Sequence, residues 1–175
     1  MVRLETDRLV MRMFTLDDFE AFERLCTDPE VMRYLADGKP LSKFEAWKSM
    51  AFLVGHWQLL GYGQFALEEK SSGRLIGRSG FLNPSGWPAF ELGWTLERAS
   101  WGKGYASEAA RRALRYAFED LDRDNVISLI HPDNKPSIKV AERIGEKLEG
   151  KTELFNKEVL IYGIDRADWR AGLKG

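Results

Sequence analysis

A glycine-rich stretch, ASWGKGYASEA at residues 99–109, carries the clearest chemical signal in the chain. Gly102 and Gly104 stand directly before an alanine-rich run, although glycine costs a helix about 1 kcal/mol relative to alanine. Glycines at a helix start expose backbone N–H groups at its positive end, which suits phosphate or pyrophosphate binding. A Cβ would hold such an anion away from the backbone. The alternative is a strand-to-helix turn in which the glycines only relieve strain.

Two common phosphate-binding patterns are absent from the sequence. It has no G-x-x-x-x-G-K-[ST], which excludes a Walker-type nucleotide loop. It also lacks the full dinucleotide pattern G-x-G-x-x-G, because Ser107 stands three residues after Gly104. The strands expected before this stretch form an antiparallel meander, whereas a dinucleotide fold begins with a βαβ unit.

Histidine and cysteine give weak signals for chemistry. His56 is expected in the middle of a helix and His131 at a strand end, and neither has the acidic or cysteine partner pattern of a nucleophilic site. Cys26 falls on the apolar face of a helix, which is typical of the core. No cluster has metal-ligand spacing, so the sequence predicts no metal site.

Hydrophobic spacing predicts the elements that must position the glycine stretch. Thr15 with Asp18, and Ser42 with Glu45, have the spacing of helix capping boxes, and Gly61 is a helix stop. The first part of the chain is therefore expected to form a strand at 9–14, a helix following Thr15, a short helix within 27–35, and a long helix between Ser42 and Gly61.

Three β segments, separated by the turn sequences SSG and NPSGWP, predict an antiparallel meander before the glycine stretch. Apolar residues at intervals of three and four then predict an amphipathic helix. The expected ranges are strands at 63–70, 74–83 and 89–96, the amphipathic helix over 106–118, a strand at 125–131, a helix ended by Gly145, and closing strands at 147–155 and 157–169.

Length and composition indicate one mixed α/β domain over residues 1–175. Hydrophobic residues make up 44% and charged residues 30%, which fits a globular protein. The net charge of −1 gives no reason to expect nucleic-acid binding. One cysteine excludes an internal disulfide and fits a reducing compartment. With no long apolar run and no signal-peptide core, we expect no membrane partner and a cytoplasmic location.

The segment WGKGYASEA resembles the acyl-CoA pyrophosphate loop of the GNAT N-acetyltransferase superfamily, whose pattern is [QR]-x-x-G-x-[GA]. Gly104 takes the invariant glycine place and Ala106 the final small place, whereas Trp101 departs from Gln or Arg. The form WGKGYA followed by SEA is similar to the RimJ/RimL-type branch. Three further stretches support that branch, LETDRLVMR, NKPSIKVAERIG and VLIYGIDRADW, so the resemblance covers roughly residues 3 to 169.

The resemblance implies the GNAT acyl-CoA N-acyltransferase fold, a mixed and mostly antiparallel sheet flanked by helices. It implies transfer of an acetyl group from acetyl-CoA to a primary amine by direct attack on the thioester, without a metal. The amine belongs to a protein N-terminus or a small molecule, and the chain is a monomer or homodimer. A non-catalytic acyl-CoA sensor or interaction module with the same fold is the alternative. Two departures keep it open: Trp101, and Ala141 in the place of the usual acid.

The resemblance also assigns the residues that bind the acyl donor. Backbone N–H groups across Gly102, Lys103, Gly104, Tyr105 and Ala106 would bind the pyrophosphate, with Ser107 as an added donor. Lys103 supplies positive charge or is simply solvated. The strand containing Trp94, Thr95 and Leu96 would pair with the pantetheine arm, as an added strand does at an open edge. A backbone N–H near Trp94 would polarise the thioester carbonyl.

Three residues are candidates for the transfer step itself. Asn134 matches the family asparagine that hydrogen-bonds the pantetheine, and the alternative is an ordinary helix cap. Many relatives place a tyrosine seven residues after it as the acid, but here Ala141 stands there, so Ser137 becomes the candidate donor to the leaving sulfur. Glu91 is either the carboxylate that takes the amine proton or a solvent-facing strand residue. Tyr162 is expected to pack near the site.

Overall fold

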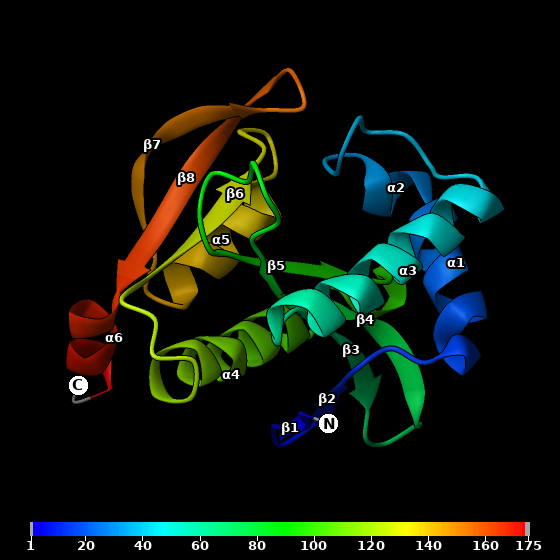
Figure 1. The fold of residues 1–175 in the computed structure, drawn as a ribbon, viewed down its shortest axis with the longest axis horizontal. Helices are drawn as coiled ribbons and strands as arrows, with labels where there is room; N and C mark the ends of the chain where they lie inside the picture. The colour runs from blue at the N-terminus through cyan, green and yellow to red at the C-terminus, as the bar shows by residue number, and fades with distance from the viewer. Residues whose placement is uncertain (1, 174–175) are drawn as a thin grey trace.

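The computed structural model describes residues 2–173 and contains an eight-stranded sheet with helices against both faces (Figure 1). The strands are β1 Leu4–Glu5, β2 Leu9–Arg12, β3 Gln64–Glu69, β4 Arg74–Leu82, β5 Glu91–Leu96, β6 Asn125–Ile130, β7 Lys147–Leu154 and β8 Lys157–Asp165. Their order across the sheet is β1-β2-β3-β4-β5-β6-β8-β7. Only the β5–β6 pair is parallel, which confirms the expected mixed and mostly antiparallel sheet.

Six α-helices connect or flank the strands. They are α1 Phe19–Thr27, α2 Pro29–Met32, α3 Lys43–Leu60, α4 Tyr105–Glu119, α5 Lys135–Arg143 and α6 Arg166–Gly172. The Ser42–Glu45 capping box begins α3, and Gly61 ends it in the left-handed conformation, as predicted. None of the described helices is long and apolar enough to cross a membrane.

Apolar side chains on the two faces of the sheet explain why the helices pack where they do. The alanine stripe of α4, which includes Ala109 and Ala113, packs with Phe81 and Leu92 on one face. On the other face α1 and α3 bury Phe22 and other residues against the sheet. In Figure 1 the sheet accordingly lies between α4 on one side and α1 with α3 on the other.

Several element limits differ from the sequence prediction, and the contacts explain two of them. The predicted strand at 9–14 ends at Arg12, whose guanidinium forms an ion pair with Asp18 at 2.8 Å. The closing strand predicted for 157–169 ends at Asp165, and α6 follows it. The Trp169 ring lies 5.1 Å from the Phe118 ring, so this last helix is held by packing on α4 that no local pattern reveals.

The parallel strands β5 and β6 barely pair. They share one residue pair, Glu91 with Ile127, whereas β4 and β5 share six. Beyond that pair the facing edges of the two strands separate, and we call this region the β5–β6 fork. Because the strands are parallel, β5 leads to α4 and β6 leads to α5 at the same end of the fork. The N-termini of both helices therefore flank it.

Candidate active site

The glycine stretch forms a loop, residues 101–104, that leads directly into the N-terminus of α4. Gly102 and Gly104 have φ values of +73° and +84°, which side-chain-bearing residues rarely adopt. Gly104 is the N-cap of α4 and has no side chain that could cap the helix. The first N–H groups of a helix have no partner within it, so here they remain available to an anion. Residues 102–104 are exposed.

The turn between β1 and β2 braces this glycine loop through two residues that no local sequence pattern singles out. Arg8 donates to the Lys103 carbonyl oxygen at 2.9 Å and, through Nε, to the Glu108 carboxylate at 2.7 Å. Thr6 donates to the same carboxylate at 2.6 Å. Arg8 and Glu108 are 100 residues apart in the chain, so only the folded sheet brings them together. The brace fixes the direction of the loop and of the first turn of α4.

Replacing Arg8 with alanine is expected to raise the KM for acetyl-CoA several-fold with little change in kcat. The variant removes the contact that holds the Lys103 carbonyl and leaves the fork untouched. Steady-state kinetics with varied acetyl-CoA measures the effect. Arg3→Ala serves as the control, because Arg3 pairs only with exposed Glu5 on the same hairpin. Equal kinetics for the two variants would contradict the bracing role.

Trp101, the departure from the family pattern, has a defined contact in the structure. Its indole Nε1–H donates to the Leu96 carbonyl oxygen at 2.8 Å. Leu96 is the last residue of β5, so the indole supplies a hydrogen bond at the end of the strand where β6 is no longer alongside. The tryptophan therefore links the glycine loop to the fork, although nearly half of its surface is exposed.

The remaining predicted donor-site residues line β5 and the first turn of α4. Trp94 is partly buried and packs against both the α4 core and the cluster of Ile130, Ala141 and Tyr162 beside α5. Thr95, Leu96, Tyr105 and Ser107 are buried, and Ala106 packs against the core. β5 is not an edge strand, but beyond Glu91 none of its residues pairs with a described residue of β6.

Glu91 lies at the start of the fork and is partly buried. The Trp87 indole donates to its carboxylate at 2.6 Å. Burial raises the pKa of Glu91 to about 7, against the opposing effects of Trp87, the Arg78 charge and the Leu129 backbone N–H. Along β5 its side chain lies on the face opposite Leu92, the face that carries α1 and α3.

Asn134 and Ser137 lie together at the N-terminus of α5. The Asn134 side-chain oxygen accepts a hydrogen bond from the Ser137 backbone N–H at 3.3 Å, so Asn134 does cap the helix. That contact uses the carbonyl oxygen and leaves the amide NH₂ group as a donor. Tyr162 is buried beside Ala141, in keeping with a packing role. Ala141 itself is fully buried, so no acid occupies the place of the family tyrosine.

The histidines and the cysteine occupy structural positions. His56 is buried, with Nδ1 2.8 Å from the Tyr62 carbonyl oxygen and Nε2 accepting from the Asn83 N–H. His131 is half-buried against the Tyr34 ring. Cys26 is buried, as predicted. Among residues 2–173 no group of three or more His, Cys, Asp or Glu side chains is placed to hold a metal ion.

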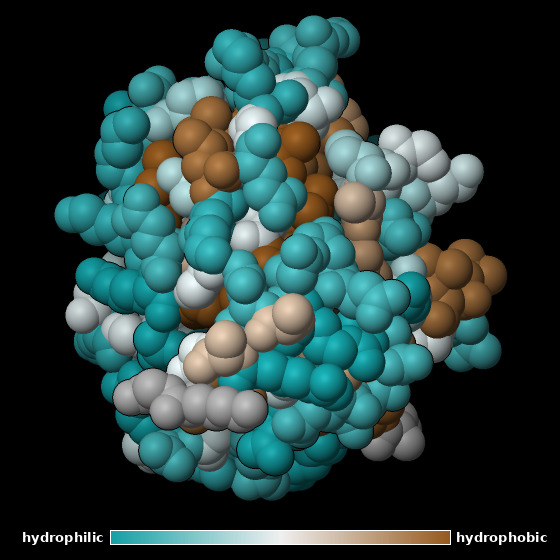
Figure 2. Space-filling model, turned by 90° about the vertical axis from the view of Figure 1, so that its left-hand side faces the viewer, coloured by the Kyte–Doolittle hydropathy of each residue, from teal (hydrophilic) through white to brown (hydrophobic). Residues whose placement is uncertain are grey.

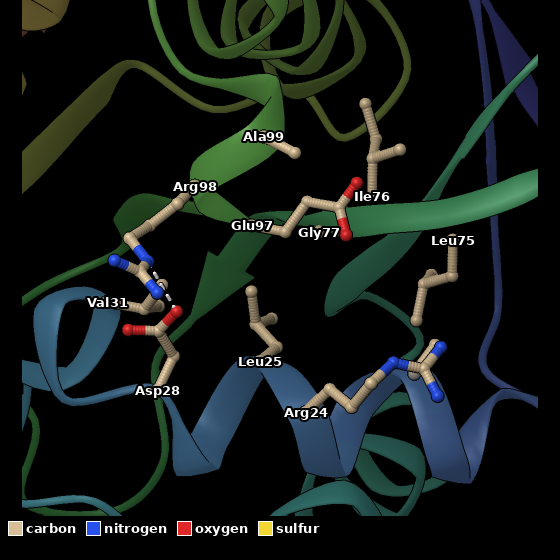
Figure 3. A pocket seen from close by; sticks show the side chains of 11 residues that line it. Arg24, Leu25, Asp28, Val31, Leu75, Ile76, Gly77, Glu97, Arg98 and Ala99 are labelled. Carbon is tan, nitrogen blue, oxygen red and sulfur yellow. Dashed lines mark hydrogen bonds and ion pairs between the residues drawn. The ribbon is translucent and has the colours of Figure 1, made fainter.

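Two cavities lie outside the predicted donor site. One of about 240 Å³ lies between α1 and the adjoining ends of β4 and β5, where Arg98 forms an ion pair with Asp28 and Arg24 points along the rim (Figure 3). The other, of about 720 Å³, lies between α4 and α6. The side of the molecule that carries α6 shows hydrophobic surface in hollows between hydrophilic side chains (Figure 2). Neither cavity is lined by a residue predicted for the site.

Comparison with known proteins agrees with this geometry. The acetyltransferase (GNAT) domain family matches residues 8–147. An uncharacterized N-acetyltransferase, p20, of Bacillus licheniformis is 30% identical over 90% of this chain and 89% of its own. The FsC-acetyl coenzyme A-N(2)-transacetylase of Aspergillus fumigatus is 31% identical over 95% and 77%. A crystal structure of an acetyltransferase from Agrobacterium tumefaciens superposes with a TM-score of 0.84 at 29% identity, covering 95% of each chain.

The chain belongs to the GNAT acetyltransferase family. It is an N-acetyltransferase with the GNAT fold, which confirms the fold and the enzyme class that the sequence resemblance implies. The family uses acetyl-CoA and acts on amines.

Proposed function

We propose that this enzyme transfers the acetyl group of acetyl-CoA directly to a primary amine, as a member of the RimJ/RimL-type branch. The observation that carries the proposal is the β5–β6 fork with the N-terminus of α4 at its end. A parted sheet offers backbone groups to an extended pantetheine chain, and the helix start offers N–H groups to the pyrophosphate. The similar Aspergillus transacetylase, whose name specifies acetyl coenzyme A, supports the same donor.

The glycine loop and the edge of β5 would hold the donor. Gly102 through Ala106 present N–H groups to the pyrophosphate, with Lys103 adding charge and Ser107 a further donor. The Trp94–Leu96 segment pairs with the pantetheine. In the register of β5 the residues Leu92 and Trp94 both face β6, while Gly93 faces β4. The Trp94 N–H therefore points into the fork, where it polarises the thioester carbonyl.

The amine must lose a proton before it attacks, because an ammonium ion has no lone pair. Glu91 approaches the fork from the face that carries α1 and α3, opposite to the face of α4 and α5. Its pKa of about 7 lets the carboxylate accept the amine proton at neutral pH. The Asn134 amide and the Ser137 hydroxyl lie at the end of the fork, where they hydrogen-bond the pantetheine and the departing sulfur.

The same pKa favours an α-amine over a lysine side chain as the acceptor. An α-amine has a pKa of about 7.7–8.0 and a lysine about 10.4, so a base near 7 matches the former far better. A protein N-terminus or a small molecule with a weakly basic amine is the proposed substrate.

We further propose that residues 1–175 form one domain, because a single sheet contains strands from Leu4 to Asp165. A cytoplasmic location and a monomeric or homodimeric state stay predictions.

A thiol-release assay tests the proposal. Purified enzyme is incubated with acetyl-CoA and one amine at a time: N-terminal peptides, lysine peptides, polyamines or aminoglycosides. Release of free CoA thiol with N-terminal peptides or another α-amine, and not with acetyl-CoA alone, is the expected result. Binding of CoA without thiol release across the panel would favour the non-catalytic module. Absence of CoA binding would overturn the donor assignment.

A further inference from the structure

Glu146 is a buried carboxyl group that the transfer reaction above does not use. Only 3% of its surface is exposed. It follows Gly145 at the end of α5, where the Gly145 N–H donates to Glu142 and the Glu146 N–H donates to Ala141. In this type of helix ending, the residue after the glycine usually makes an apolar contact with the last turn. A carboxyl group there is costly to bury unless hydrogen bonds compensate.

The contacts of Glu146 call for a proton on its carboxyl group if Ser128 makes both of its hydrogen bonds. The Ser128 Oγ lies 2.8 Å from the Leu92 carbonyl oxygen and 2.9 Å from Glu146 Oε1. A serine hydroxyl carries one proton, and the Leu92 oxygen can only accept. The second proton must come from Glu146, which donates to Ser128 while Ser128 donates to Leu92. In agreement, burial raises the pKa of Glu146 to about 8.

This chain of hydrogen bonds lies where β5 and β6 part. The Ile127 N–H still donates to the Phe90 carbonyl oxygen at 3.1 Å. In a regular parallel pair the next bond would join the Leu129 N–H to the Leu92 carbonyl oxygen. Here the Ser128 hydroxyl takes the Leu92 oxygen instead. A side chain thus replaces the donor of the missing bond.

We propose that Glu146 is a positioning residue that keeps the β5–β6 fork open for the acyl donor by fixing the Ser128 hydroxyl on the Leu92 carbonyl. An unsatisfied buried backbone carbonyl would favour closure of the strands onto each other. With that carbonyl satisfied, the Trp94 N–H, two residues further along β5, stays free for a ligand. The inference rests on the proposed function, since it assumes that the fork binds acetyl-CoA.

The charges around Glu146 favour its neutral form. Glu149 on β7 and Glu91 on β5 both act to raise its pKa, and Ser128 on β6 opposes them. When Glu146 ionises above about pH 8, its carboxylate becomes an acceptor for the Ser128 proton. The Leu92 carbonyl then loses its donor. We therefore expect the KM for acetyl-CoA of the wild-type enzyme to rise above pH 8.

Two variants of Glu146 separate this role from simple packing. Glu146→Gln keeps a donor, the amide NH₂, and cannot ionise, so it is expected to match the wild-type KM at pH 7 and to lose the rise above pH 8. Glu146→Leu removes the donor and supplies the apolar residue that the helix ending favours. We expect it to raise the KM for acetyl-CoA about 10-fold at pH 7, the equivalent of one lost hydrogen bond, without lowering the Tm.

A measurement without substrate tests the neutral acid itself. In ¹³C NMR of the glutamate side-chain carboxyl groups, one resonance of the wild-type protein is expected to titrate near pH 8. Glu146→Gln should abolish that resonance, and Ser128→Ala should shift its titration.

The inference is overturned if no such resonance exists, if the Gln variant keeps the alkaline rise in KM, or if the Leu variant has the wild-type KM. A failure of the proposed function gives a different result, because the wild-type enzyme then neither binds acetyl-CoA nor releases thiol. The NMR titration does not depend on acetyl-CoA, so it still decides whether Glu146 is a neutral acid.

Discussion

Replacing Gly102 with alanine is expected to raise the KM for acetyl-CoA by roughly 10- to 100-fold, the equivalent of losing one charge-assisted hydrogen bond. Gly102 has a φ of +73°, and an added Cβ would meet no atom within 4 Å. The substitution therefore acts through the backbone: alanine avoids the left-handed region, and the loop must turn its N–H groups away from the pyrophosphate. Steady-state kinetics measures the rise in KM, and isothermal titration of acetyl-CoA measures the accompanying loss of affinity.

Gly61 provides a matched control for this experiment. It has a φ of +74°, an added Cβ there would likewise meet no atom within 4 Å, and it ends α3 away from the glycine loop. Gly61→Ala and Gly102→Ala should therefore lower the free energy of unfolding by a similar amount, roughly 1–2 kcal/mol. Only the Gly102 variant should lose affinity for acetyl-CoA. Equal affinity in the two variants would show that the glycine loop is only a strand-to-helix turn.

Local patterns were sufficient to predict most of the elements. The capping pair Ser42 and Glu45 begins α3, and both ends of that helix depend on residues within a few positions. The face that α4 buries is likewise predicted by local sequence, namely by the spacing of its alanines. Such signals are readable because the physical cause, a cap or an apolar stripe, lies within one or two turns of its effect.

Two contacts of the site that the sequence did not reveal join separate elements of the chain. The Arg8–Glu108 brace joins two elements 100 residues apart, and the Ser128–Glu146 contact joins β6 to the end of α5. Glu146 also breaks the local pattern, since the position after a helix-ending glycine predicts an apolar residue or an exposed polar one. The bond from Trp101 to Leu96 spans only five residues, but no local pattern predicts it.

Asn134 can serve both as a helix cap and as a hydrogen-bond donor to the pantetheine. The structure confirms the helix cap through the Asn134 oxygen, while the donor role rests on its amide nitrogen and stays a prediction. The two atoms of one side chain serve different partners, so a cap contact does not argue against a ligand contact.

Replacing Glu91 with glutamine is expected to lower kcat by about 10²–10⁴-fold, the range typical of a lost general base, with the KM for acetyl-CoA close to wild type. Glutamine keeps an oxygen to accept from Trp87 but cannot take a proton from the amine. Because the pKa of Glu91 lies near 7, kcat/KM of the wild-type enzyme should rise with pH through about 7. The glutamine variant should lack that rise.

Stability distinguishes this effect from damage to the fold. The raised pKa means that the folded protein holds the Glu91 proton more tightly than the unfolded chain does, so ionisation lowers stability as pH rises from about 4.5 to about 7. The glutamine variant is free of that cost, and its free energy of unfolding at pH 8 should be no lower than that of the wild type. Glu97→Gln, at the far end of β5 and paired with Arg74, is the matched control and should retain near wild-type kcat. If the Glu91→Gln enzyme has unchanged kcat across pH 6–9, Glu91 is not the general base. The rate acceleration would then come from positioning of the amine.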